Sequence, residues 1–279
     1  MLAVLRQGRY LRLLAVALVA AALCGAAGRW QYERWHGKRD ANAELRANAA
    51  AAPVPVETLL APGRAFDPAL RMRPVRASGR YDPAGEVYVR QRQVENEAAF
   101  LVVTPLRTTA GPVLLVVRGW VPAGGSALET PRVPAPPDGE VSVLGRAYPS
   151  EPGGSSTRLP DRQVNRIDAA AIGQRLGAET FQGYAELVDQ QPPNAGPASA
   201  GSPGAGSPGA GKTSLSVLPT PDLSNPAGGA DEWQHLAYVV QWYLFAVIAL
   251  LAPFLLAYLE RRPAVTSAMT VGEPSRPWP

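Results

Sequence analysis

The sequence is organised around the stretch Asp231–Arg262, which reads DEWQHLAYVVQWYLFAVIALLAPFLLAYLERR. Its 24 residues from Leu236 to Leu259 carry no charge, and about 20 apolar residues are enough for a helix to cross the hydrocarbon core of a bilayer. A helix also satisfies its own backbone hydrogen bonds, which lipid cannot do. The stretch therefore predicts a transmembrane helix, which we place at residues 235–259.

The first third of this helix carries an aromatic face. His235, Tyr238, Trp242 and Phe245 recur at helical spacing, beside Gln241, so an imidazole, a phenol and two further rings share one side. Such a face can hold a large flat ligand. The same residues can instead form the aromatic belt that membrane helices place at the lipid boundary, with the histidine in water. The pattern alone leaves both interpretations open.

A second apolar run lies near the N-terminus. The 16 residues Leu13–Gly28 are uncharged, with Arg12 before them and Arg29 after them. This length suits either a signal peptide or a short transmembrane helix whose flanking arginines extend toward the headgroups. We expect an uncleaved transmembrane helix at residues 13–30.

The charges around the second helix predict the topology. Asp231 and Glu232 precede it and Arg261-Arg262 follow it, and positive residues favour the cytoplasmic side. We therefore expect cytoplasmic tails at residues 1–12 and 260–279, with the central domain outside. The composition is rich in Arg, Ala and Pro, as in bacteria with GC-rich genomes, so we expect a multi-pass protein of the bacterial cell membrane.

Residues 31–189 are expected to form the extracytoplasmic domain. The first helix continues into it as a polar extension until Pro53 and Pro55 stop it. Short runs rich in Val, Tyr and Leu then alternate with Gly and Pro turn residues, which is typical of β-strands. The expected elements are strands at Val75–Tyr81, Glu86–Arg90, Phe100–Thr104, Val113–Arg118, Val141–Ala147 and Gly183–Val188, and a short helix at Asp168–Leu176. The fold class is thus a membrane protein with two transmembrane helices flanking a β-rich α+β domain, built on a small antiparallel sheet or barrel.

The triplet Arg118-Gly119-Trp120 ends one of these strands at a turn. Glycine permits tight backbone geometry, and tryptophan supplies the large apolar surface of a core residue. We interpret the triplet as structural rather than as a contact with a partner.

Residues 190–230 are expected to form a flexible linker, because Pro, Gly, Ala and Ser cannot build a hydrophobic core. Within it, Gly206–Thr213 match the phosphate-loop pattern GxxxxGKT. A working phosphate loop needs a strand that enters it and a helix that leaves it, and the sequence around this match has neither pattern. We therefore expect no nucleotide site.

Composition argues against several other functions. The net charge of +4 comes from 25 Arg and two Lys spread along the chain, without a basic block, so no nucleic-acid partner is expected. The single cysteine, Cys24, lies in the first apolar run, and the two histidines are His36 and His235. The part of the chain outside the membrane therefore has no disulfide, and a metal site made of several histidines is excluded.

Four blocks of the sequence occur in a distinctive order: GRWQYER at 28–34 with Lys38, GRY at 79–81 followed by FLVVTPL at 100–106, RGWVP at 118–122, and HLAYVVQWYLFA at 235–246. In this order, framed by two membrane helices, they resemble the surfeit locus protein 1 family of cytochrome c oxidase assembly factors. The resemblance covers residues from about 13 to 262. The chain departs from the family at Asn165, where an aromatic residue is common, and in its longer linker.

The resemblance implies a role in handling haem a. The family histidine implicated in haem contact corresponds to His235, which we expect to be the haem iron ligand, with Tyr238 and Trp242 packed on the macrocycle. Arg34 and Lys38 are expected either to meet haem propionates, since a guanidinium pairs well with a carboxylate, or to face lipid headgroups. Arg34 is the one that we include among the cofactor-binding residues. His36 is expected to be a solvated residue rather than a second axial ligand.

The implied function is that of a non-enzymatic assembly factor, which binds or shelters haem a transiently and stabilises the catalytic subunit of the haem-copper oxidase during cofactor insertion. Its expected partners are oxidase subunit I, other oxidase assembly or haem a synthesis proteins, and membrane lipid. Catalysis is not expected, because no histidine lies among the predicted strands to serve as a base. The alternative is a membrane scaffold that holds oxidase subunits together without haem.

Overall fold

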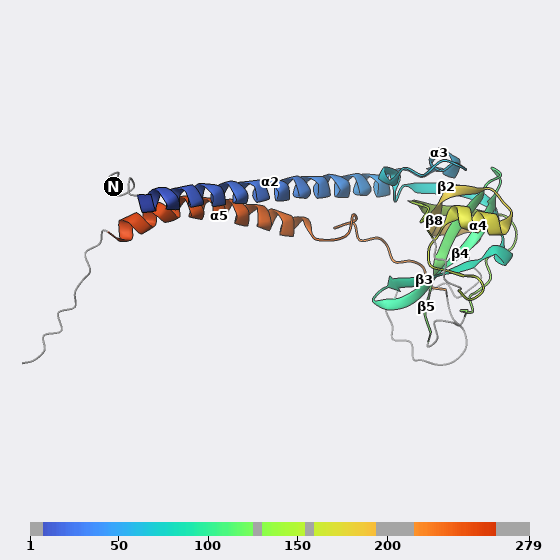
Figure 1. The fold of residues 1–279 in the computed structure, drawn as a ribbon. Helices are drawn as coiled ribbons and strands as arrows, with labels where there is room; N and C mark the ends of the chain where they lie inside the picture. Colours follow the sequence, from blue (N-terminus) through green and yellow to red (C-terminus); the bar gives the residue numbers. More distant parts are fainter. Residues whose placement is uncertain (1–7, 125–129, 154–158, 194–214, 261–279) are drawn as a thin grey trace, which may run out of the picture. The chain divides into compact units, whose positions relative to one another are not determined.

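The computed structural model describes residues 8–124, 130–153, 159–193 and 215–260, which belong to two compact units (Figure 1). The helical unit comprises the described residues up to Arg39 and from Gly228 onward. The sheet unit comprises those between Asp40 and Ala227. Helix α2, Gly8–Ala50, contributes to both units, and helix α5 is Glu232–Leu259.

Both long helices are apolar enough to cross a membrane. Their most apolar windows have mean hydropathies of 2.1 in α2 and 2.2 in α5, and only 11% of each window is buried. Two apolar helices therefore flank a sheet-rich domain along the chain, as predicted. Helix α2 ends at Ala50, just before the two prolines expected to stop it. Arg261 and Arg262, on which the predicted topology depends, lie outside the described residues.

The sheet unit contains every strand that the sequence predicted, with shifted ends, and two short strands that it did not. The strands are β1 Val54–Pro55, β2 Pro74–Tyr81, β3 Val87–Val94, β4 Glu97–Thr108, β5 Val113–Pro122, β6 Val141–Pro149, β7 Gln163–Val164 and β8 Thr180–Gln191. The short helices are α3 Val56–Leu59, η1 Pro68–Leu70, η2 Pro83–Gly85 and α4 Ala169–Leu176. Helix α4 starts where expected, because the Asp168 carboxylate caps it by accepting the Ala171 N–H at 3.1 Å.

Five of the strands close into a barrel. The sheet order is β1-β2-β6-β8-β5-β4-β3-β7, and an additional pairing of β2 with β4 completes a ring of β2, β6, β8, β5 and β4. Closure depends on Gly79, which pairs with Thr108, because a Cβ atom at Gly79 would lie 2.1 Å from the carbonyl oxygen of Arg107. The expectation of an antiparallel sheet is wrong for β5 and β8. They pair in parallel because the chain crosses back through β6 and α4 before β8 begins.

Strand β5 separates two hydrophobic layers. Leu114 and Val116 point into the barrel, toward buried residues from the other ring strands and α3. Leu115 and Val117 point to the opposite face, where they pack with β3, β4 and α4. Successive residues of a strand face opposite sides, and burial of both sides explains the continuous apolar run that begins at Val113.

A buried polar network surrounds Arg118, near the end of strand β5. The pairing of β4 with β5 skips Arg118, which places its side chain in a β-bulge. Its guanidinium donates to the Glu86 carboxylate and to the Thr104 hydroxyl, each at 2.8 Å. Tyr88 donates to the same carboxylate at 2.9 Å. Arg118 is only 1% exposed and Trp120 6%, which confirms the structural interpretation of the Arg118-Gly119-Trp120 triplet.

The segment 215–227 is attached to the sheet unit rather than extended as a free linker. Ser216 pairs with Trp120 of β5 through two backbone hydrogen bonds of 2.8 and 3.0 Å. Further along, the segment is held by hydrogen bonds to side chains, which join Leu223 and Ser224 to Arg46, Pro226 to Arg71, and Asn225 and Ala227 to Asn42. The rest of the predicted linker from residue 194 to 214, with the phosphate-loop match Gly206–Thr213, lies outside the described residues.

Candidate functional site

The helical unit has a regular seam. Buried and half-buried positions on α2 recur at alternating spacings of three and four residues: Tyr10, Leu14, Ala17, Ala21, Cys24, Gly28, Gln31, Trp35 and Lys38. The same alternation occurs on α5 at His235, Val239, Trp242, Ala246, Ala249 and Pro253. A repeat of about 3.5 residues is the period at which two helices keep one face against each other. The two helices therefore bury a common seam along their length.

Contacts at three heights show that the two helices run antiparallel, side by side (Figure 1): Tyr10 with Glu260, Gly28 with Tyr243, and Lys38 with Gly228. A Cβ atom at Gly28 would lie 3.2 Å from the ring of Tyr243. Glycine at this position therefore lets α5 come near α2.

Four predicted residues gather on one side of this pair. Gln31 and His235 meet across the seam on the side opposite to the contact of Gly28 with Tyr243. A helical residue three positions further on is rotated by about 60°, so Arg34 lies beside Gln31, and Tyr238 lies beside His235. Trp242 continues the line of His235 along the seam. We call the set of Gln31, Arg34, His235, Tyr238 and Trp242 the helix-pair site.

The structure divides the predicted aromatic face of α5 into two parts. His235 and Trp242 are half-buried in the seam. Tyr238 and Phe245 stand beside the seam and are 49% and 42% exposed. Trp242 and Phe245 are in edge-to-face contact, with ring centroids 6.1 Å apart. His235 and Trp242 are therefore packed against α2, whereas Tyr238 and Phe245 form an aromatic wall that is open to the surroundings of the helix pair.

The His235 imidazole has a hydrogen-bond partner that the sequence did not identify. Its Nδ1 lies 3.3 Å from Oε1 of Gln31. An amide oxygen can only accept, so the ring donates from Nδ1, and Nε2 keeps its lone pair. A neutral imidazole with a fixed Nδ1–H is the form that binds a metal through Nε2. The available signal was the polar Gln31, which follows the small residues Ala17, Ala21, Cys24 and Gly28 at spacings of three and four.

The cationic residues of this region have different surroundings. The Arg34 guanidinium lies 5.3 Å from the centre of the Trp30 ring, and its side chain is exposed. Stacking on an aromatic ring leaves the in-plane N–H groups of the guanidinium available to a carboxylate or phosphate. Lys38 instead donates to the backbone carbonyl of Gly228. Of these two residues, Arg34 is the one placed to meet an anionic group.

His36 is not brought to the helix-pair site. Its ring contacts Tyr32 and Trp35, at centroid distances of 4.4 and 4.8 Å. It follows Gln31 by five residues, which is a rotation of about 140° around the helix. Among the described residues, no three His, Cys, Asp or Glu side chains converge as a metal site. A metal at His235 would therefore depend on ligands brought by a cofactor or a partner.

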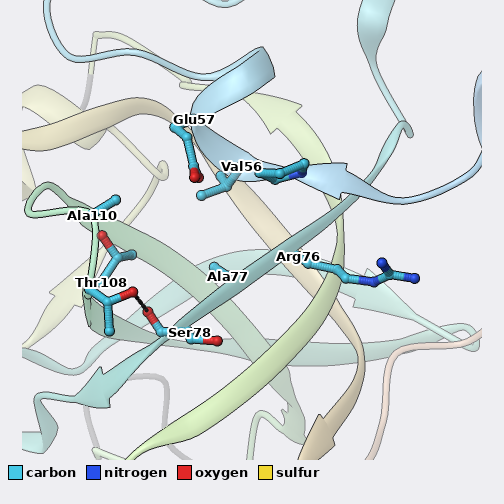
Figure 2. A pocket seen from close by; sticks show the side chains of 9 residues that line it. Val56, Glu57, Arg76, Ala77, Ser78, Thr108 and Ala110 are labelled. Atoms are coloured by element: carbon cyan, nitrogen blue, oxygen red, sulfur yellow. Dashed lines mark hydrogen bonds between the residues drawn. The ribbon is translucent and has the colours of Figure 1, made fainter.

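The sheet unit offers cavities of a different character. Figure 2 shows one of about 230 Å³, lined by Pro55–Glu57, Arg76–Ser78 and Thr108–Ala110. The Arg76 side chain points away from Glu57, and the Thr109 hydroxyl is 3.4 Å from the Ser78 carbonyl. Two further cavities, of about 370 and 360 Å³, lie beside α4. None of the three is lined by a histidine or cysteine.

Known proteins are similar to this chain over both the sheet unit and the helix-pair site. The family model described as SURF1 family matches residues 18–247, which include all five residues of the site. Uncharacterised SURF1-like proteins of Mycobacterium bovis and Mycobacterium tuberculosis are 30% identical over 258 residues, covering 89% of this chain and 84% of each relative. The match spans most of both chains, and the resemblance seen in the four sequence blocks is confirmed: the chain belongs to the SURF1 family.

Proposed function

We propose that this protein is an assembly factor for haem-copper cytochrome c oxidase, which binds or shelters haem a at the helix-pair site and stabilises the catalytic subunit while the cofactor is inserted. The family is generally associated with cytochrome oxidase assembly. The observation that carries the proposal is the position of the His235 imidazole, whose Nδ1 lies 3.3 Å from the side-chain oxygen of Gln31. A neutral ring that donates to this oxygen from Nδ1 keeps Nε2 as an acceptor.

The residues of the site fit a haem. A haem brings four nitrogen ligands of its own, so a single imidazole is sufficient as an axial ligand, and haem bound there would supply an iron centre held through Nε2. Trp242 and Tyr238 provide an aromatic wall for the macrocycle edge. The exposed guanidinium of Arg34, stacked on Trp30, suits a propionate.

The proposal includes a membrane location. Helices α2 and α5 are taken to span the bacterial cell membrane, with both termini in the cytoplasm and the sheet unit outside. Their apolar and largely unburied surfaces support this. A reporter fused after Arg262 should then be active only in the cytoplasm, and one inserted after Gly139, in the sheet unit, only outside. The reverse pattern would contradict the topology and the partners proposed below.

The proposed partners are oxidase subunit I, other oxidase assembly or haem a synthesis proteins, and membrane lipid. We propose a binding role without catalysis, because the helix-pair site holds an imidazole without a nucleophile beside it. A scaffold without haem is the second candidate. It is favoured by the outer faces of both helices, which expose large apolar residues, including Val16, Val19, Leu23, Leu251 and Leu255. Helices of a partner subunit could pack there.

The test is to co-express the chain with a haem a biosynthesis pathway, purify it in mild detergent, and measure the haem absorbance per protein. We expect the wild type to carry haem and His235→Ala to lose most of it. His36→Ala is the matched control, because it removes the other histidine from the opposite side of α2. Full retention of haem by His235→Ala would reject the ligand role. Copurification of subunit I with that variant would then support the scaffold.

A further inference from the structure

We propose that Gln31 is a positioning residue for His235: its side-chain oxygen holds the imidazole in the Nδ1–H tautomer and directs Nε2 away from the seam. The proposal rests on the proposed function, because Nε2 is the atom that would meet the iron. The two residues come from different helices, 204 positions apart in the chain, and their atoms lie 3.3 Å apart.

In this hydrogen bond, the His235 ring must be the donor and the Gln31 oxygen the acceptor. The amide oxygen of Gln31 has lone pairs and no proton, so the hydrogen bond exists only when Nδ1 of His235 carries hydrogen. Both side chains are half-buried in the seam, where fewer waters compete for the hydrogen bond than at an open surface. The tautomer of a neutral histidine is set by the hydrogen bond that one of its nitrogens makes. Without Gln31, the ring is free to exchange tautomers and to rotate.

The backbone holds Gln31 in place. One turn before it, Gly28 lies so close to Tyr243 that a Cβ atom would be 3.2 Å from the ring. One to two turns after it, Lys38 donates to the carbonyl of Gly228. Gln31 thus lies between two contacts of α2, one with α5 and one with the segment just before α5, and both limit how far this part of α2 can shift near His235.

The tautomer can be measured without haem. The chain has two histidines, so a sample labelled with ¹⁵N-histidine in detergent micelles gives two sets of ring signals, with His36 as an internal reference. The spectra are recorded in alkaline buffer, because the two ring nitrogens of a neutral imidazole give distinct signals that report its tautomer. We expect His235 to show a protonated Nδ1 and an unprotonated Nε2.

Two variants test the cause. Gln31→Leu removes the acceptor with little change in size, and we expect the His235 signals to move toward a mixture of tautomers while those of His36 stay unchanged. Gln31→Glu keeps an oxygen acceptor, and we expect it to retain the protonated Nδ1. A wild-type His235 protonated on Nε2, or identical His235 signals in Gln31→Leu and wild type, would overturn the proposal.

A second readout links the tautomer to binding. Loss of the group that orients a metal-binding histidine typically weakens metal binding by about 10- to 100-fold. We expect a loss of that size when apo-protein with Gln31→Leu is titrated with ferric protoporphyrin IX, and recovery with Gln31→Glu. Equal binding by wild type and Gln31→Leu would overturn the positioning role alone. A wild type that binds no haem would overturn the proposed function as well, whatever the tautomer.

Discussion

Arg118 and Glu86 form an ion pair 2.8 Å long inside the sheet unit, where their side chains are 0% and 6% exposed. Thr104 bridges the two, because its hydroxyl accepts from the guanidinium at 2.8 Å and donates to the carboxylate at 2.7 Å. A charge in this position is tolerated only while its partners remain. The network therefore joins β5 to β4 and to the residue that precedes β3.

Replacing Arg118 should unfold the sheet unit more readily. Arg118→Met leaves the Glu86 carboxylate buried without its cation, and breaking a buried pair in this way costs about 3–5 kcal/mol. The measurement is denaturant unfolding of the full chain in micelles, followed by circular dichroism. Arg107→Met is the control, because Arg107 pairs with Asp82 at the surface and is 53% exposed, where a pair contributes about 0–1 kcal/mol. Equal costs for the two variants would contradict the structural role of the network.

Glu186 should make the stability of the sheet unit depend on pH. Burial raises the pKa of its carboxyl, against the hydrogen bond from Tyr148 and the nearby Arg146 and Arg92, which lower it. The folded chain thus binds this proton more tightly than the unfolded chain. Its contribution to stability is present below the unfolded pKa of about 4.3 and is lost as pH rises through the folded pKa.

Glu186→Gln should remove that dependence. A neutral amide can still accept from Tyr148 and carries no charge to desolvate. We expect the variant to gain stability relative to wild type at pH 7, with the gain shrinking toward pH 4. Unfolding midpoints measured across that range check it, with the exposed Glu140→Gln as control. A gain that grows as pH falls would reverse the sign of the shift assigned to Glu186.

Gly119 should be needed to hold the segment 215–227. A Cβ atom at Gly119 would lie 2.3 Å from the carbonyl oxygen of Ser216, which is the acceptor for the Trp120 N–H. Gly119→Ala should therefore expose the amides around Ser216 to faster hydrogen exchange, measurable by mass spectrometry. Gly124→Ala is the matched control, because its Cβ would meet nothing within 4 Å. Unchanged exchange in Gly119→Ala would mean that the segment is held without this contact.

The close approach of the two helices should be disrupted by a larger side chain at position 28 but not by one at position 25. Gly28→Leu must displace Tyr243, whereas a Cβ at Gly25 meets nothing within 4 Å. We expect Gly28→Leu to reduce haem absorbance per protein and to disturb the His235 ring signals, although Gly28 lies on the other side of the seam. Gly25→Leu should behave as wild type. Similar losses in both variants would indicate a general effect on helix α2.

Local patterns in the sequence were sufficient to predict the two long helices, the six longer strands and helix α4. The uncharged runs identified both helices, alternating Val-rich runs identified the main strands, and Asp168 marked the start of α4. These signals act over a few residues, through hydrophobic periodicity and capping. The resemblance pointed to His235 and Arg34 as candidates, and in the structure His235 lies beside Gln31 while Arg34 lies over the Trp30 ring.

Relationships between distant residues were not predictable in the same way. The barrel closes because Gly79 has no Cβ atom to clash with the backbone of β4. No residue near Gly79 in the sequence indicates that Thr108 will be its pairing partner. The partner of His235 is Gln31, and finding it required the register of two helices nearly 200 residues apart. Arg118 interrupts an apolar strand. It can be buried because Glu86, which follows the separate helical turn η2, supplies a carboxylate partner. These features depend on tertiary packing rather than on local preference.

The attachment of Ser216 to Trp120 has a consequence for how this sequence can vary. Strand β8 ends at Gln191, and the chain is already paired with β5 again at Ser216. Additions or losses between residues 194 and 214 therefore fall between two points of the same domain. They should change neither the residue at which α5 begins nor the position of His235 within it, so relatives with longer or shorter Pro- and Gly-rich inserts can share the same pair of helices.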